Sequence, residues 1–316
     1  MAELALDIQG VTKRYANFTA VRSLSLAVPA GAVYGLLGPN GAGKTTTIRM
    51  ILNIIAPDEG TITLLGRPNS DGASMDRVGY LPEERGLYKK MQVRRVLRFL
   101  AQLKGVSARE ADRRIGEWME RLSLKTPEKD WGLSKIDELS RGMQQKVQFI
   151  GTLLHDPDLV ILDEPFSGLD PINAQALKDT VVHLKKRGKT VIFSTHLMDN
   201  AERLCDSVCI IARGNKVLDG TVSGVKREHG GNNVALSLAG DGAEVVSRIL
   251  SDHRRWSGWM TRIASSRSPS RRTRTRRRSC GSWWSLAPRC SGLNSCSHRC
   301  TRSSWKRSAP RASKRE

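Results

Sequence analysis

Leu159-Val-Ile-Leu-Asp-Glu164 is the stretch that decides the fold, because four apolar residues run directly into two carboxylates. A short, continuous apolar run is typical of a strand that is buried on both faces, as in a parallel sheet. Asp163 would then emerge at the carboxyl edge of the sheet, where ligands bind in open α/β folds. One carboxylate can bind a metal ion, and the second remains for other chemistry.

A glycine-rich loop lies a little over 110 residues before this strand. It matches G-x-x-x-x-G-K-[ST] in full and stands between an apolar strand and a helix, which is the context of a phosphate-binding loop. Lys44 would neutralise β- and γ-phosphate charge, and Thr45 would bind Mg²⁺ together with Asp163. Glu164 would then polarise an attacking water as a general base. The nucleotide contacts that we expect from this loop are Gly38, Pro39, Asn40, Gly41, Ala42, Gly43, Lys44, Thr45 and Thr46.

A third motif, Leu139-Ser-Arg-Gly-Met-Gln-Gln145, lies between the other two. Ser140 and Gly142 fall at the start of a predicted helix, where free N–H groups and the helix dipole attract anions. The phosphate loop of the same chain already holds a phosphate, so these two residues have none in their own subunit. An ordinary serine N-cap is the alternative interpretation.

Apolar patterning predicts alternating strands and helices around these motifs. Val93, Val96, Leu97 and Leu100 recur at helical spacing and open a block of helices that interrupts the alternation. We therefore expect an α/β fold with a largely parallel sheet and an inserted helical subdomain at about 85–150. The predicted strands are 4–8, 24–28, 33–37, 61–65, 78–81, 159–163, 190–194, 208–212 and 216–219, and the other predicted helices are 43–54, 107–124, 140–155, 172–187 and 197–204.

Charge is distributed unevenly along the chain, whose 316 residues carry a net charge of +21. Residues 251–316 hold 18 of the 52 Lys and Arg but two of the 31 Asp and Glu, so they account for +16 of that total. The remaining +5 on residues 1–250 is ordinary for a cytosolic enzyme and does not favour a nucleic-acid-binding protein. No signal peptide and no run of 18 apolar residues is visible, so we expect any membrane role to come through a partner.

The three motifs, in this order, resemble the ATPase subunits of ABC transporters over about residues 3–222. The resemblance implies a P-loop NTPase core of the ABC type, with ATP and Mg²⁺ as cofactors. It implies that Ser140 and Gly142 contact the γ-phosphate held by an opposite subunit, so that ATP joins a homodimer or a pair with a second ATPase subunit. It also implies that His196 hydrogen-bonds the γ-phosphate, that Asp170 lies in the loop coupling the two sites, and that Tyr15 stacks on adenine. A core aromatic is the alternative interpretation of Tyr15.

Three positions depart from the family pattern. Arg141 and Met143 stand where the family usually has glycine and glutamine, although Ser140 and Gly142 are kept. Glu83 stands where the family has a glutamine that contacts Mg²⁺. A carboxylate still offers an oxygen to the metal, but it adds charge and lacks the amide donor.

Within the family, residues 80–88 and 139–146 look like the sodium-extrusion and drug-export subunits, whose permeases are separate polypeptides. This likeness implies an ATP-hydrolysing subunit that powers an integral-membrane permease, an exporter of ions or small molecules. Such a subunit would be cytoplasmic and peripheral on the inner face of the membrane, and no nucleic-acid partner is expected. The alternative is a soluble ABC ATPase of translation or nucleic-acid maintenance. That class generally has two cassettes, long coiled coils or zinc insertions, whereas this chain has one cassette, no heptads and no Cys-x-x-Cys.

The end of the chain departs from the family. We expect an ATPase domain at 1–222, the start of a partial C-terminal α/β accessory domain at 223–251, and a basic, disordered tail at 252–316. Moving the reading frame one nucleotide upstream over 299–306 can yield Pro/Ser-Leu-His-Glu-Ile-Phe-Val-Glu, which resembles the usual end of the accessory domain. The tail is therefore predicted to be out of frame. A genuine basic tail that binds nucleic acid or acidic lipid is the alternative.

Overall fold

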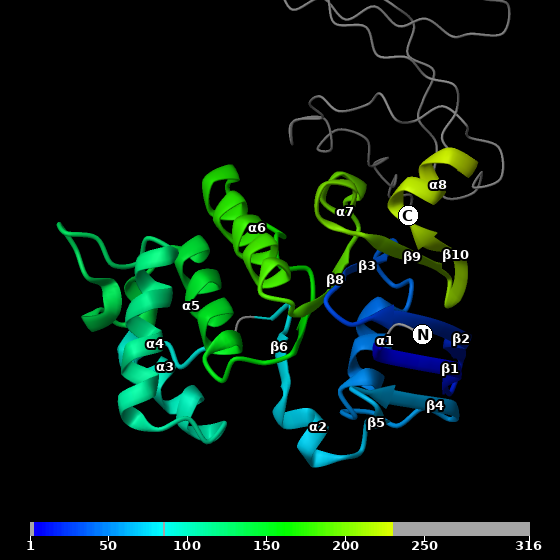
Figure 1. Cartoon of the computed structure of the whole chain (residues 1–316), viewed down its shortest axis with the longest axis horizontal. Helices are drawn as coiled ribbons and strands as arrows, with labels where there is room; N and C mark the ends of the chain where they lie inside the picture. The colour runs from blue at the N-terminus through cyan, green and yellow to red at the C-terminus, as the bar shows by residue number, and fades with distance from the viewer. Residues whose placement is uncertain (1–2, 85, 230–316) are drawn as a thin grey trace, which may run out of the picture. The chain divides into compact units, whose positions relative to one another are not determined.

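The computed structural model describes residues 3–84 and 86–229 (Figure 1). The chain divides into two units, Met1–Val225 and Lys226–Glu316, and nearly all described residues belong to the first. The predicted accessory strand at 233–238 and the tail from residue 252 lie outside the described residues.

A six-stranded sheet forms the centre of the first unit. All neighbouring strands are parallel except the pair at one edge, Ser207–Ala212 and Asn215–Thr221, which is antiparallel. The predicted α/β fold with a largely parallel sheet is therefore confirmed. In spatial order the strands are β10 (Asn215–Thr221), β9 (Ser207–Ala212), β3 (Val33–Leu37), β8 (Thr190–Thr195), β7 (Leu159–Leu162) and β6 (Val78–Leu81).

The sequence of strand β7 is apolar without alternation because both faces of the strand are covered. Val160 and Leu162 belong to one hydrophobic core, and Leu159 and Ile161 belong to another. All four side chains are fully buried. The strand therefore separates two cores, as the continuous apolar run predicts.

Helices cover one face of this sheet. The core on this side joins Val160 and Leu162 to the apolar faces of the inserted helices and of the helix after β7. The first two inserted helices, Val93–Leu103 and Ala108–Arg121, place most of their buried residues three or four positions apart, which is the spacing of one helical face. The helices are α3 (Val93–Leu103), α4 (Ala108–Arg121), α5 (Arg141–Leu153) and α6 (Pro171–Lys186), with the 3₁₀ turns η1 (Trp131–Leu133) and η2 (Ile136–Glu138) before α5.

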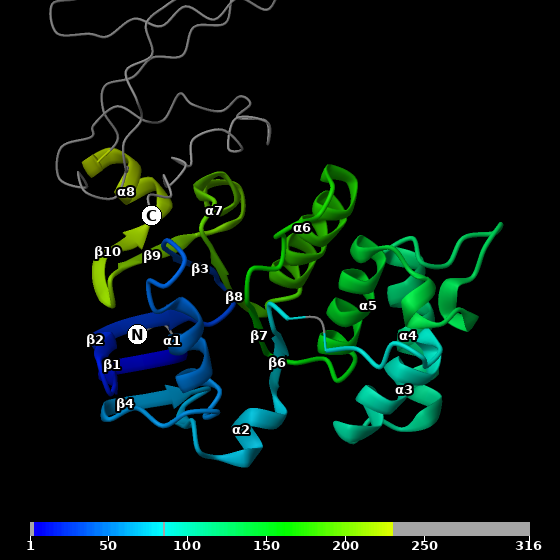
Figure 2. The ribbon, with the colours of Figure 1, turned by 180° about the vertical axis from the view of Figure 1, so that it is seen from behind.

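An antiparallel sheet, which the sequence did not predict as such, and helix α1 (Lys44–Ile51) contribute to the core on the other face. Two of its strands were predicted only in part, at 4–8 and 24–28, whereas each runs for 12 residues. Figures 1 and 2 show this blue sheet and the green helices on opposite sides of β3 and β8. In spatial order its strands are β2 (Phe18–Pro29), β1 (Leu4–Tyr15), β4 (Glu59–Leu64) and β5 (Arg67–Pro68).

Three shorter helices complete the described part: α2 (Gly72–Asp76), α7 (Met198–Leu204) and α8 (Val222–His229). Among the described residues, no helix combines the length and the apolar composition needed to cross a bilayer.

Candidate active site

The phosphate loop runs from the end of β3 to the start of α1 and is enclosed by backbone from distant parts of the chain. A side chain at Gly38 would collide with the carbonyl oxygen of Ile211, and one at Gly43 would meet the carbonyl oxygen of Ala20 at 2.5 Å. Gly43 also has a φ of 108°, which L side chains rarely adopt. Close packing therefore requires glycine at both positions.

Lys44 is held inside this loop although its ammonium is charged. The residue is 6% exposed, and its Nζ donates to the carbonyl oxygens of Gly38 at 2.8 Å and Pro39 at 3.2 Å. Helix α1 begins at Lys44 without a side-chain cap, so the N–H groups of its first turn are available to an anion. The loop thus combines a fixed cation with free backbone donors.

Asp163 and Glu164 follow β7, and a buried serine of the neighbouring strand β8 connects them. The hydroxyl of Ser194 donates to Asp163 Oδ1 at 2.5 Å and accepts the N–H of Glu164 at 2.9 Å. Glu164 has a φ of 47°, a left-handed conformation that is uncommon for a long side chain. Ser194 therefore helps to hold a strained residue that the sequence analysis had singled out as the general base.

Three predicted catalytic side chains meet at one point. Glu164 is 8% exposed, and its carboxylate lies 3.3 Å from Lys44 Nζ. His196 Nδ1 lies 3.1 Å from both carboxylate oxygens of Glu164. These groups come from the loops after β3, β7 and β8, which are adjacent in the sheet. A γ-phosphate bound by Lys44 would consequently lie within reach of Glu164 and His196.

A cavity of about 430 Å³ opens over this point. Glu83, the predicted metal contact, and Phe18 line it, whereas Tyr15 does not. Tyr15 stacks on Phe18 with ring centroids 5.5 Å apart, and both rings are exposed. The pair therefore presents aromatic surface beside the cavity. The lining residues are Phe18, Ala20, Asn40, Gly41, Ala42, Gly43, Lys44, Thr45, Thr46, Glu83 and Glu164.

The residues that we expect to hold Mg²⁺ fit that ion. Asp163 is 1% exposed, and its Oδ2 has no hydrogen-bond partner within the described residues. A buried carboxylate oxygen without a partner is costly unless a cation or donor reaches it. The described part contains no group of three or more His, Cys, Asp or Glu that could hold a metal by themselves. Mg²⁺ does not need such a group, because it is usually bound by one or two carboxylates together with phosphates and water.

Ser140 and Gly142 do not line this cavity. Ser140 is the N-cap of α5 and accepts the N–H of Met143 at 3.3 Å, so the N-cap interpretation is correct as far as local structure goes. Gly142 packs so closely on Asn173 that a Cβ would collide with its amide. Asn173 in turn donates to Asp170 at 2.5 Å. The amide donors of Asn173 and neighbouring backbone hold the pKa of Asp170 below its usual range.

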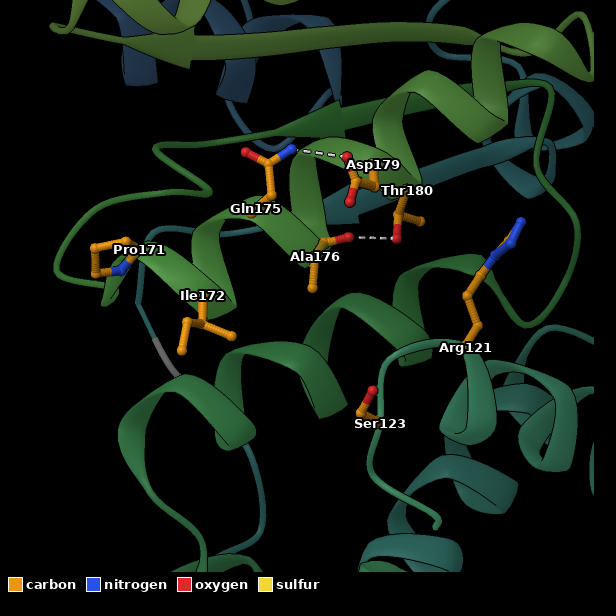
Figure 3. Close-up of a pocket in the computed structure, with 8 residues that line it drawn as sticks. All are labelled: Arg121, Ser123, Pro171, Ile172, Gln175, Ala176, Asp179 and Thr180. Carbon is orange, nitrogen blue, oxygen red and sulfur yellow. Dashed lines mark hydrogen bonds between the residues drawn. The ribbon is translucent and has the colours of Figure 1, made fainter.

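A larger hollow of about 640 Å³ lies between α6 and the end of α4 (Figure 3). Its polar groups are bonded to one another: Gln175 donates to Asp179 at 2.8 Å, and Thr180 donates to the carbonyl oxygen of Ala176 at 2.9 Å. Arg121 is its one cation among the described residues that line it. The hollow is therefore not built to bind a triphosphate.

A glycine loop that encloses a lysine, beside a strand that ends in two carboxylates, defines the P-loop nucleoside triphosphatases, and this chain is one of them. Residues 21–167 match the family model described as ABC transporter. The uncharacterized ABC transporter ATP-binding protein YhaQ of Bacillus subtilis strain 168 is 48% identical over 231 residues, 73% of this chain and 76% of that protein. Nod factor export ATP-binding protein I of Mesorhizobium japonicum is 38% identical over 250 residues, 78% of this chain and 72% of that protein.

A solved structure of the ATP-binding subunit of an ABC transporter superposes with a TM-score of 0.65 at 32% identity, covering 71% of this chain and 92% of that one. This chain belongs to the family of ABC transporter ATP-binding subunits and is an ATPase.

Two residues of the site were missed by the sequence analysis. Ser194 stands two positions before His196, and its position at the end of an apolar strand beside β7 is the signal that could have identified it. Phe18 lies three residues after Tyr15, but nothing in the sequence shows which of the two aromatic rings lines the cavity.

Proposed function

We propose that this chain hydrolyses ATP with Mg²⁺ to power a separate membrane permease, an exporter of ions or small molecules. The observation that carries the proposal is the meeting of Lys44, Glu164 and His196 beside the phosphate loop, with Ser140 and Gly142 left outside the same cavity. One subunit would thus supply the reacting groups, while Ser140 and Gly142 would contact a phosphate outside that cavity. The similarity to a protein named for Nod factor export supports the export direction.

In the proposed mechanism, Lys44 binds the β- and γ-phosphates and Glu164 takes a proton from the attacking water. The water oxygen forms a bond to the γ-phosphorus, the bond to the β–γ bridging oxygen breaks, and ADP and phosphate leave. His196 lies against Glu164 through Nδ1 and orients both the carboxylate and the γ-phosphate. Asp163, Thr45 and Glu83 would hold Mg²⁺, which neutralises phosphate charge when it is bound.

A second ATPase subunit would complete each site. Ser140 and Gly142 begin the 13-residue helix α5, whose N-terminus is the positive end of the helix dipole and does not line the cavity of its own phosphate loop. A γ-phosphate on the opposite subunit is the anion that would bind there. Asp170, through its bond to Asn173 against Gly142, would pass the state of one site to the other.

Substituting Gly142 with alanine tests this arrangement. The new Cβ would collide with Asn173, so we expect hydrolysis to fall at least about tenfold, because the phosphate contact and the Asn173–Asp170 bond are both displaced. ATP binding to the phosphate loop of the same subunit should persist. Steady-state hydrolysis and ATP titration measure the two effects separately.

The double variant Gly142→Ala/Asn173→Ala removes the collision and serves as the control. Full recovery of hydrolysis in the double variant would contradict the coupling role of the Asn173–Asp170 bond, since the packing at Gly142 would have been restored without that bond.

An exposed apolar contact next to Glu83 is our candidate for the permease-docking surface. Tyr88 and Phe99 pack edge to face with ring centroids 5.9 Å apart, and both rings remain partly exposed. Leu103, at the end of α3, is 65% exposed, and Lys89 follows Tyr88 directly. The loop of Tyr88 continues from the one that carries Glu83, so a shift at the γ-phosphate would reach this surface.

Site-directed crosslinking tests the docking surface in a background without native cysteines. A cysteine at position 88 should crosslink to the cytoplasmic loops of the permease, because Tyr88 is 54% exposed and central to the apolar contact. A cysteine in place of Val182, which is 38% exposed on α6, is the matched control. Equal crosslinking from both positions would count against this surface.

The permease itself can be found from the gene neighbourhood. A neighbouring reading frame that encodes a six-span membrane protein would supply the partner for the crosslinking experiment. The alternative, an ABC ATPase of translation or nucleic-acid maintenance, is not favoured, because the relatives above are named for transport.

A further inference from the structure

Two side chains of helix α5 donate hydrogen bonds to residues 80–84, the segment that contains Glu83. Gln148 Nε2 donates to the carbonyl oxygen of Glu84 at 3.0 Å, and Thr152 Oγ1 donates to that of Tyr80 at 3.2 Å. The two residues are one helical turn apart and lie on the same face of α5. Packing is tight at the second bond, where a Cβ at Gly79 would come within 2.5 Å of the Thr152 carbonyl oxygen. Thr152 therefore joins α5 to strand β6, whereas Gln148 joins it to the loop beyond.

Gln148 is an energetically unfavourable residue at this buried position. It is 7% exposed, and its Oε1 has no hydrogen-bond partner within the described residues. The amide orientation is fixed, because a carbonyl oxygen such as that of Glu84 can only accept and must face the NH₂ group. A buried amide with one unsatisfied end costs more than an apolar side chain of similar size. The bond to Glu84 is thus not explained by packing.

The Glu83 carboxylate has no side-chain partner of its own among the described residues. Within the described residues, no hydrogen bond or ion pair that involves the carboxylate holds it, and the residue lines the phosphate cavity exposed to solvent. The next carbonyl along the chain is the one that Gln148 fixes. Gln148 therefore anchors to α5 the backbone one residue beyond Glu83.

We propose that Gln148 is a positioning residue that directs Glu83 toward Mg²⁺ at the phosphate loop and connects it with α5. The inference rests on the proposed role of Glu83 as a metal contact. Because Ser140 and Gly142 are at the start of α5, the same helix joins the metal-contacting loop of one site to the phosphate contact offered to the opposite subunit. Gln148 is the described side chain that bonds this helix to that loop.

The test is the gain in affinity for a fluorescent, non-hydrolysable ATP analogue when Mg²⁺ replaces EDTA. Gln148→Met keeps the side-chain volume and removes the hydrogen bond, and it should reduce this Mg²⁺-dependent gain about 3–10-fold, the effect of one lost hydrogen bond. Affinity in EDTA should stay within about twofold, because Lys44 and the phosphate loop are untouched.

Thr152→Val is the matched control, since it removes the other bond of α5 to the same segment. It should leave the Mg²⁺-dependent gain unchanged, and thermal melting of both variants checks that each one is folded. If Gln148→Met does not fold, Gln148→Ala replaces it, because alanine is the best helix former. A folded Gln148 variant with the wild-type gain overturns the inference, as does an equal loss in Thr152→Val.

Glu83→Ala distinguishes failure of the inference from failure of the proposed function. If Glu83→Ala loses the Mg²⁺-dependent gain and Gln148→Met keeps it, only the role of Gln148 is wrong. If Glu83→Ala also keeps the gain, the metal-contact role of Glu83 is wrong and the inference fails with it.

Discussion

Replacing Glu164 with glutamine is expected to slow ATP hydrolysis by about 10²–10⁴-fold, the usual contribution of a general base. ATP binding should persist, because Lys44 keeps its bonds to Gly38 and Pro39 and the phosphate loop is intact. An amide also lacks the negative charge that Glu164 places 3.3 Å from the phosphate-binding ammonium. The variant should therefore accumulate as a dimer closed around ATP.

Light scattering coupled to size exclusion, with and without ATP and Mg²⁺, measures this accumulation. Glu117→Gln is the control, because it makes the same change from carboxylate to amide at an exposed position on α4. This variant should hydrolyse ATP normally. If the Glu164 variant binds ATP and stays monomeric under both conditions, the proposed dimer is wrong.

Lys44→Ala should weaken ATP binding by about 100-fold or more and abolish measurable hydrolysis. A hydrogen bond to a charged group contributes about 1.5–3 kcal/mol, and the ammonium is positioned to reach two phosphates. Isothermal titration with ATP measures the loss. Lys125→Ala, which removes an exposed lysine paired with Glu120, should bind ATP as wild type does.

The same substitution should also lower stability without nucleotide. Lys44 and Glu164 are 6% and 8% exposed, and removing one partner of a buried pair costs about 3–5 kcal/mol because the other charge remains buried. Lys44→Ala/Glu164→Gln should regain much of that stability without regaining ATP affinity. Recovery of binding in the double variant would show that Lys44 acts on the fold and not on the phosphates.

The sequence predicted the strands β3 and β6 to the residue, because each is a short apolar run that ends at a glycine or proline loop. The phosphate loop was recognisable because its glycines and lysine have fixed spacing. Strands β1 and β2 were predicted too short, since irregular register between them breaks the apolar alternation on which the prediction depended. Their assembly into a separate antiparallel sheet was missed for the same reason.

The contacts of the site were less predictable than its residues. Lys44 and Glu164 were identified from local motifs and His196 from the family resemblance. Their 3.1–3.3 Å contacts depend on β7, β8 and β3 being neighbours in the sheet. No local pattern encodes that order. The bridging role of Ser194 and the bond from Gln148 to Glu84 were missed because both join segments at least 30 residues apart.

Strand order also determines when the site can form during synthesis. Strand β3 leaves the ribosome early, yet among the described strands it pairs only with β8 and β9. The backbone of Ile211, which packs against Gly38, is among the last described segments to be translated. The hairpin of β1 and β2 can form at once, since it joins neighbouring segments. A nascent chain that ends before β9 therefore leaves one edge of the apolar strand β3 unpaired and lacks the Ile211 backbone that packs on Gly38, so we expect chaperones to contact the chain over that interval.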